Sequence, residues 1–119
     1  MLINIDFRDK RPLYEQVSDR LEELIIRGVI APNEALPSVR ALAVELSINP
    51  NTVQKAYAAL EQKGIIYSVS GRGSFAADAE DILPRKREEF FGELKELVGR
   101  GEALGIPRKD MIEAINGPG

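Results

Sequence analysis

Two short helices joined by a very short turn constrain this sequence most strongly, and they lie in the segment "SVRALAVELSINPNTVQKAYAALEQKG". Ser38 is a good N-cap for the first helix, because its hydroxyl can accept a hydrogen bond from a free N–H group of the first turn. This helix ends near Ser47. Its apolar residues fall on one face: Val39, Leu42, Ala43 and Leu46.

The second helix of the pair combines an apolar stripe with a polar face. Asn49 can cap it, and Pro50 suits the first helical position, where an N–H group would have no internal partner. Gly64 ends the helix. The stripe follows the spacing i, i+3, i+4, i+7 with Val53, Ala56, Tyr57 and Leu60. The helix therefore packs through one face and leaves polar side chains on the other.

Further elements flank this pair. "LINID" alternates apolar and polar residues and predicts a short strand, and a helix from about Pro12 to Gly28 follows. The segment "VIAPNEALP" then serves as a connector. Beyond the pair, the β-prone runs 65–69 and 74–77 flank a glycine-rich tip and predict a hairpin. The order helix, helix, helix, hairpin is that of a winged helix-turn-helix, which makes the fold class mainly α with a small β-hairpin.

The absence of two residue types excludes most catalytic chemistry. The 119 residues include no Cys and no His, so Ser/His and Cys/His triads and the usual zinc sites cannot be built. The remaining side chains form no recognisable carboxylate pair or nucleophile turn. We therefore expect no enzyme, no cofactor and no metal.

We expect the chain to act in the cytoplasm, without a membrane. No apolar run approaches the ~20 residues that a membrane span needs. The N-terminal sequence "MLINIDFRDK" lacks the basic, apolar and small-residue order of a signal peptide.

The net charge of −3 is unevenly distributed. Residues 1–77 carry nine Lys/Arg and nine Asp/Glu, whereas residues 78–119 carry seven and ten. All the excess acid therefore lies in the last third of the chain. The charges within residues 35–77 leave a small basic surface: Arg40, Lys55, Lys63 and Arg72 against Glu45 and Glu61. Such a surface is compatible with a nucleic-acid partner.

We expect a second part of the chain at residues 78–119, after a domain at residues 1–77. "AADAEDILP" is predicted to be an acidic linker, followed by two amphipathic helices separated by a break at Gly99–Gly105. About 40 residues seldom bury enough area to be stable alone, so we expect the apolar stripes to form a dimer interface. Its candidate residues are Phe90, Phe91, Leu94, Leu97, Val98, Met111, Ile112 and Ile115. Cofactor stacking by the two Phe residues is a minor alternative.

The run "LPSVRALAVELSINPNTVQKAYAALEQKGIIYSVSGRGSF" strongly resembles the DNA-binding domain of GntR-type bacterial transcription regulators. Within this run, the sequence Pro50-Asn51-Thr52, followed by "KAY" at residues 55–57, is similar to that of the YtrA-type branch. The resemblance covers residues 12–77 and rests on several motifs in fixed order. It implies a short two-helix dimerisation module and no roomy ligand pocket within one subunit; a small-molecule effector stays unknown.

The resemblance also implies which residues meet DNA. Arg40 corresponds to a DNA contact from the second helix, with a plain surface charge as the alternative. The recognition-helix contacts correspond to Asn49, Asn51, Thr52, Gln54 and Lys55, although capping alone explains Asn49 and a back-bonding role for Thr52 is equally favoured. The wing tip corresponds to Ser70, Gly71, Arg72 and Gly73, for which a solvent-exposed turn is the alternative. A phosphate loop is excluded there, because a β-prone run and not a helix follows the glycines.

These residues predict a sequence-specific DNA-binding transcription regulator. We expect a homodimer that binds an inverted-repeat operator on double-stranded DNA and represses transcription. The alternative is a winged-helix module that binds a protein without specific DNA binding. Salt-sensitive binding would favour DNA, since phosphate contacts release counterions.

Overall fold

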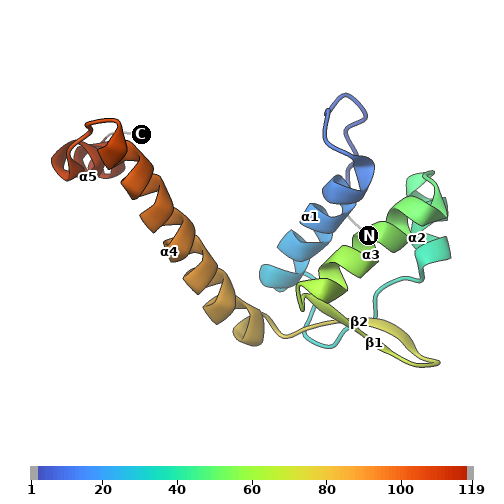
Figure 1. The fold of residues 1–119 in the computed structure, drawn as a ribbon. Coiled ribbons are helices and arrows are strands. Elements are labelled where there is room, and N and C mark those ends of the chain that lie inside the picture. Colours follow the sequence, from blue (N-terminus) through green and yellow to red (C-terminus); the bar gives the residue numbers. More distant parts are fainter. Residues whose placement is uncertain (1–2, 118–119) are drawn as a thin grey trace. The chain divides into compact units, whose positions relative to one another are not determined.

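The computed structural model describes residues 3–117. The chain divides into two compact units, one ending at Leu83 and the other beginning at Pro84, whereas the sequence placed the boundary between residues 77 and 78. The elements, shown in Figure 1, are α1 (Leu13–Ile26), α2 (Val39–Leu46), α3 (Pro50–Gln62), β1 (Ile66–Val69), β2 (Gly73–Ala76), α4 (Ala79–Ala103) and α5 (Arg108–Asn116). The expected order of three helices and a hairpin is confirmed. Among the helices of residues 3–117, none has the length and apolar character to cross a membrane.

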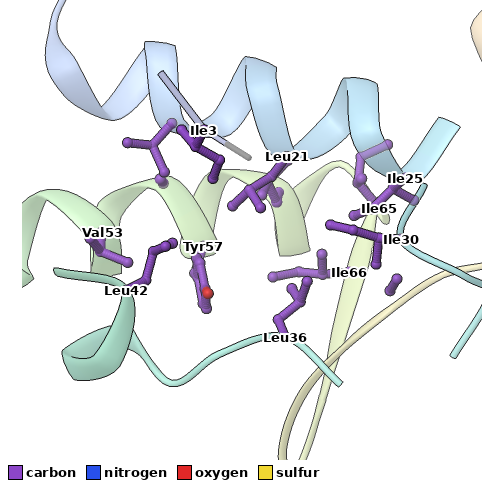
Figure 2. Packing of buried hydrophobic residues seen from close by; sticks show 14 of the residues in the cluster. Ile3, Leu21, Ile25, Ile30, Leu36, Leu42, Val53, Tyr57, Ile65 and Ile66 are labelled. Carbon is purple, nitrogen blue, oxygen red and sulfur yellow. The ribbon is translucent and has the colours of Figure 1, made fainter. Parts of the chain in front are cut away.

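Helix α3 packs against both α1 and α2, and the core of the first unit draws residues from all three helices and from the hairpin (Figure 2). The predicted stripe of α3 is confirmed, since all four of its members are buried. The side chains that are fully enclosed include Val17, Leu21 and Ile25 of α1, Leu42 of α2, and Val53 and Leu60 of α3. Each buried side chain of this size contributes roughly 1.5–3 kcal/mol relative to exposure, so these three helices hold one another in place.

The N-termini of α2 and α3 are capped as the sequence predicts. The Ser38 hydroxyl accepts a hydrogen bond from the Ala41 backbone N–H at 3.1 Å, and the Asn49 side chain accepts one from Asn51. Helix α1 begins at Leu13, one residue later than expected, so Pro12 is its N-cap residue and not its first helical residue. Pro12 provides no side-chain cap.

The expectation of a strand at "LINID" is wrong for its described part, because residues 3–6 form no strand. The reason is the buried side chain of Gln16. Its Oε1 accepts a hydrogen bond from the Asp6 backbone N–H at 2.9 Å, and its Nε2 donates to the Asp6 carbonyl at 3.0 Å. This side-chain amide takes the place of a strand partner, while Ile3 still reaches the core at 7% exposure.

The hairpin is confirmed, and the connector before α2 adds to its edge. β1 and β2 pair antiparallel, with Tyr67 opposite Phe75. Ala35 forms an isolated antiparallel bridge with Phe75. The Leu36 backbone N–H donates to the Ser74 carbonyl at 2.8 Å, which continues the pairing. The segment that the sequence predicted to be only a connector therefore fixes the position of the wing.

The expectation of an acidic linker at "AADAEDILP" is wrong, because α4 begins at Ala79 and includes Pro84. Asp78 starts the helix: its carboxylate accepts a hydrogen bond from the Glu80 backbone N–H at 2.9 Å. Ile82 then enters the core of the first unit at 1% exposure. The acidic composition that resembles a linker is favourable at a helix N-terminus, where the dipole attracts negative charge.

The break between the last two helices is shorter than the predicted Gly99–Gly105. Helix α4 continues to Ala103. Gly105 then adopts φ +82, and the Ile106 backbone N–H donates to the Gly101 carbonyl at 3.0 Å. This is the Schellman pattern that ends a helix at a left-handed glycine, so only the last of the glycines in this stretch interrupts the helix.

Candidate nucleic-acid interface

Helix α3 presents polar side chains next to its capped N-terminus. The Asn49 Oδ1 accepts the Asn51 N–H at 2.8 Å, which confirms that Asn49 caps the helix. The side chains of Asn51, Gln54 and Lys55 are exposed, and that of Thr52 is half-buried. Amide and ammonium groups in this arrangement can meet base edges and phosphates, so the residues predicted to read DNA share one accessible face.

The turn between α2 and α3 sets the angle of this face. Ser47 adopts the left-handed conformation at φ 56, and the Ile48 backbone N–H donates to the Ala43 carbonyl at 3.0 Å. A residue other than glycine seldom adopts the left-handed conformation. Here Ser47 does so because it ends α2 and starts the turn. The two helices therefore form the helix-turn-helix arrangement that the sequence predicts.

A buried tyrosine ties α3 to the start of α2. Tyr57 is 4% exposed, as expected of a core residue, and its hydroxyl donates to the Pro37 carbonyl at 2.7 Å. Burial, and to a smaller degree the negative charge of Glu45, raises the pKa of Tyr57 to about 12. The hydroxyl therefore remains a hydrogen-bond donor over the physiological pH range.

Arg40 lies in the first turn of α2, close in sequence to Pro37, whose carbonyl accepts the Tyr57 hydroxyl. Its side chain is exposed. Within residues 3–117 the guanidinium has no acidic partner. An exposed arginine without an acidic partner in this range is available to a phosphate or a guanine edge.

The predicted wing tip forms the turn between β1 and β2. Ser70, Gly71, Arg72 and Gly73 are all exposed. Gly71 and Gly73 have φ values of +74 and +105, although a Cβ at either position would meet nothing within 4 Å. Backbone conformation, and not space, therefore requires glycine here. The turn leaves the Arg72 side chain accessible at the tip.

The base of the wing depends on two residues that sequence reasoning did not single out. The Tyr67 hydroxyl donates to Asn33 Oδ1 at 2.8 Å, and the Tyr67 ring stacks on Phe75 with 5.7 Å between centroids. Asn33 itself is left-handed, at φ 64. The Pro-Asn pair is a turn signal in the sequence, but no local pattern connects Asn33 with Tyr67.

A second contact not predicted from the sequence lies between α1 and α3. The Lys55 Nζ lies 4.2 Å from the centroid of the Tyr14 ring. Tyr14 lies in the first turn of α1. Its proximity to Lys55 depends on how α1 packs on α3, which no periodicity reveals.

In the second unit, the candidate dimer residues lie at the surface of α4 and α5. Phe90, Phe91, Leu97, Ile112 and Ile115 are exposed, and Leu94, Val98 and Met111 are half-buried. An apolar groove of about 400 Å³ lies between the two helices. Its lining includes Leu94, Leu97, Val98, Met111 and Ile115. The two rings of Phe90 and Phe91 contact each other edge to face at 5.4 Å.

Comparison with known proteins gives these features a context. The family description "Bacterial regulatory proteins, gntR family" matches residues 13–76. The "HTH-type transcriptional repressor YtrA" of Bacillus subtilis is 36% identical, over 96% of this chain and 89% of the relative. A crystal structure of a transcriptional regulator from Oenococcus oeni is similar with a TM-score of 0.72 and 29% identity, over 98% of this chain and 96% of that one. A crystal structure of AraR(DBD) in complex with operator ORX1 has a TM-score of 0.57 and 29% identity, over 63% of this chain and 96% of that one.

Proposed function

Because the chain belongs to the gntR family of bacterial regulatory proteins, and to its YtrA-type branch, it is a DNA-binding transcription regulator, and we propose that it acts as a homodimeric repressor on an inverted-repeat operator. The observation that carries the proposal is the exposed polar face of the capped helix α3, together with the exposed Arg40 in the first turn of α2. A winged helix-turn-helix places such a helix in the major groove.

Each group of exposed residues has a role in this proposal. Asn49, Asn51, Thr52 and Gln54 read base edges, for which amides and hydroxyls are suited. Arg40 and Lys55 contact the backbone or a guanine and set the register of the protein on the duplex. The wing tip at 70–73 flanks the site, where Arg72 enters the minor groove.

The C-terminal unit supplies the dimer. An apolar groove with exposed Leu and Ile side chains is costly to leave in water, and a second copy of the unit would cover it. A two-fold dimer presents two α3 helices to half-sites about 34–36 Å apart, and a palindromic operator has the matching symmetry. The relative from B. subtilis is named a repressor, and we propose that this protein also represses transcription.

The proposal places the protein in the cytoplasm, where its DNA is, and gives it no catalytic step. Repression then follows from occupancy of a promoter. No cofactor is needed for the contacts described.

Fluorescence anisotropy with duplexes tiled across the protein's own promoter tests the proposal. We expect tight binding to one tile, lost when that tile is scrambled, and weaker at physiological than at low salt because phosphate contacts release counterions. Equal, salt-insensitive binding to every duplex would contradict it and would favour the protein-binding alternative. Shifting the half-sites of the bound tile by about five base pairs, half a helical turn, should abolish binding if a two-fold dimer is the active form.

A further inference from the structure

The contact between Lys55 and Tyr14 joins the recognition helix to α1. The ammonium of Lys55 lies 4.2 Å from the ring centroid, well within the ≈ 6 Å reach of a cation–π interaction. Within residues 3–117 this is the only interaction of the ammonium. Among the described residues, Lys55 therefore has an aromatic partner and no acidic one.

Tyr14 is held firmly enough to position another side chain. Its ring is half-buried and packs against the edge of the hydrophobic core. The hydroxyl is 3.5 Å from Glu15 Oε1, which is at most a weak hydrogen bond. The ring is therefore fixed through its apolar part.

The two side chains share one surface with the start of α3. A shallow depression is lined by Pro12, Leu13 and Tyr14 of the α1 start and by Asn51, Thr52 and Lys55 of α3. The contact thus lies within the face proposed to read DNA.

We propose that Tyr14 is a positioning residue that holds the Lys55 ammonium at this face, ready to donate to a DNA phosphate. This inference rests on the proposed function, since it assumes that α3 meets DNA. The ring occupies one side of the ammonium, and a lysine has three N–H donors, so donors remain for a phosphate. A lysine has four flexible bonds to order on binding, and a ring that already restrains it lowers that entropic cost.

A double-mutant cycle measures the coupling on operator DNA. Tyr14→Leu should weaken binding roughly two- to fivefold for each half-site, the effect of one exposed cation–π contact per subunit. Lys55→Met should weaken it further and lower the slope of log affinity against log salt by about 1.8, because the dimer loses one phosphate contact in each subunit. In the Lys55→Met background, Tyr14→Leu should have no further effect. An equal effect of Tyr14→Leu in both backgrounds would overturn the proposal, because Tyr14 would then act without Lys55.

Matched variants separate positioning from folding and from charge. Tyr14→Phe keeps the ring face and should restore near wild-type affinity; a loss as large as that of Tyr14→Leu would assign the effect to the hydroxyl and overturn the proposal. Lys63→Met removes a charge from the C-terminal end of α3, where Lys63 lies 4.0 Å from Glu22, and should leave the salt slope unchanged. If Tyr14→Leu lowers the thermal midpoint, Tyr14→Met, which retains a long apolar side chain, replaces it in the cycle.

A measurement without DNA distinguishes failure of this inference from failure of the proposed function. In carbon–proton NMR spectra of lysine-labelled protein, the Lys55 ε-CH₂ protons should be shifted upfield by the Tyr14 ring, and the shift should vanish in Tyr14→Leu. No upfield shift in the wild type would overturn the positioning role even if operator binding is specific. A clear shift in a protein that binds no DNA specifically would instead overturn the role in DNA binding.

Discussion

At the scale of single residues, exposure and pairing separate the polar side chains that hold the fold from those left for a partner. Tyr57 and Gln16 are buried, and both side chains form hydrogen bonds to backbone groups. Arg40 and Arg72 are exposed, and within residues 3–117 neither guanidinium has an acidic partner. Substitutions at the two kinds of position should therefore affect different measurements.

Replacing Arg40 by Ala should weaken operator binding by about 1–3 kcal/mol, the usual effect of losing a specific arginine contact. The free energy of unfolding should change by less than about 0.5 kcal/mol, because the side chain is exposed and has no acidic partner among residues 3–117. Anisotropy and urea unfolding measure the two quantities. Arg27→Ala, which removes an equal charge at the end of α1, is the control; unchanged affinity in Arg40→Ala would contradict the DNA contact.

Replacing Tyr57 by Phe should lower the free energy of unfolding by about 0.5–1.5 kcal/mol at neutral pH, since the Pro37 carbonyl loses its donor. The pKa of Tyr57 is raised from 10.0 to about 12 in the folded state. The resulting stabilisation is complete below pH 10 and is lost as the pH rises towards 12.

The Phe variant should not lose this stabilisation, so its stability should fall less than that of the wild type between pH 10 and pH 12. Urea unfolding over this range measures the difference. Parallel pH profiles for the two proteins would show that Tyr57 titrates normally. Tyr67→Phe is the control, because its hydroxyl bonds an exposed Asn33 at the surface.

At the scale of elements, helix ends are decided by local chemistry, and one such end combines two roles. Asn49 caps α3 and is also a candidate base contact. The cap requires only a side-chain oxygen, whereas a bidentate contact to adenine requires the whole amide. The two roles can therefore be separated by the choice of substitution.

Asn49→Ser should keep the stability of the wild type, because serine caps about as well as asparagine, while Asn49→Ala should lose about 1 kcal/mol. If the amide reads a base, both variants should weaken operator binding by about 1–3 kcal/mol. Thermal unfolding and anisotropy measure these effects. Wild-type affinity in Asn49→Ser would show that the residue serves as a cap alone.

At the scale of the whole molecule, the two units have different surfaces. The first unit encloses its apolar stripes, whereas α4 and α5 leave theirs exposed around an apolar groove. A surface of this kind is expected to associate with a matching one.

Replacing Phe91 and Leu94 together by Gln should produce monomers at micromolar concentration. Each lost apolar side chain removes about 1.5–3 kcal/mol of burial, and a symmetric interface loses it twice. Sedimentation velocity measures the change. Val44→Gln, an apolar-to-Gln change at a residue 75% exposed on α2, should leave the association state as it is; a dimer that persists in the double variant would place the interface elsewhere.

The sequence by itself determined the helix starts at Ser38 and Asn49, the buried stripe of α3 and the position of the wing, because caps, apolar periodicity and turn glycines act over only a few residues. It failed at "LINID" and at the acidic start of α4, where Gln16 and the burial of Ile82 decide the outcome. The same holds for the contacts of Lys55 with Tyr14 and of Tyr67 with Asn33. These pairs are far apart in the chain, so only tertiary packing brings them together, and no local pattern encodes it.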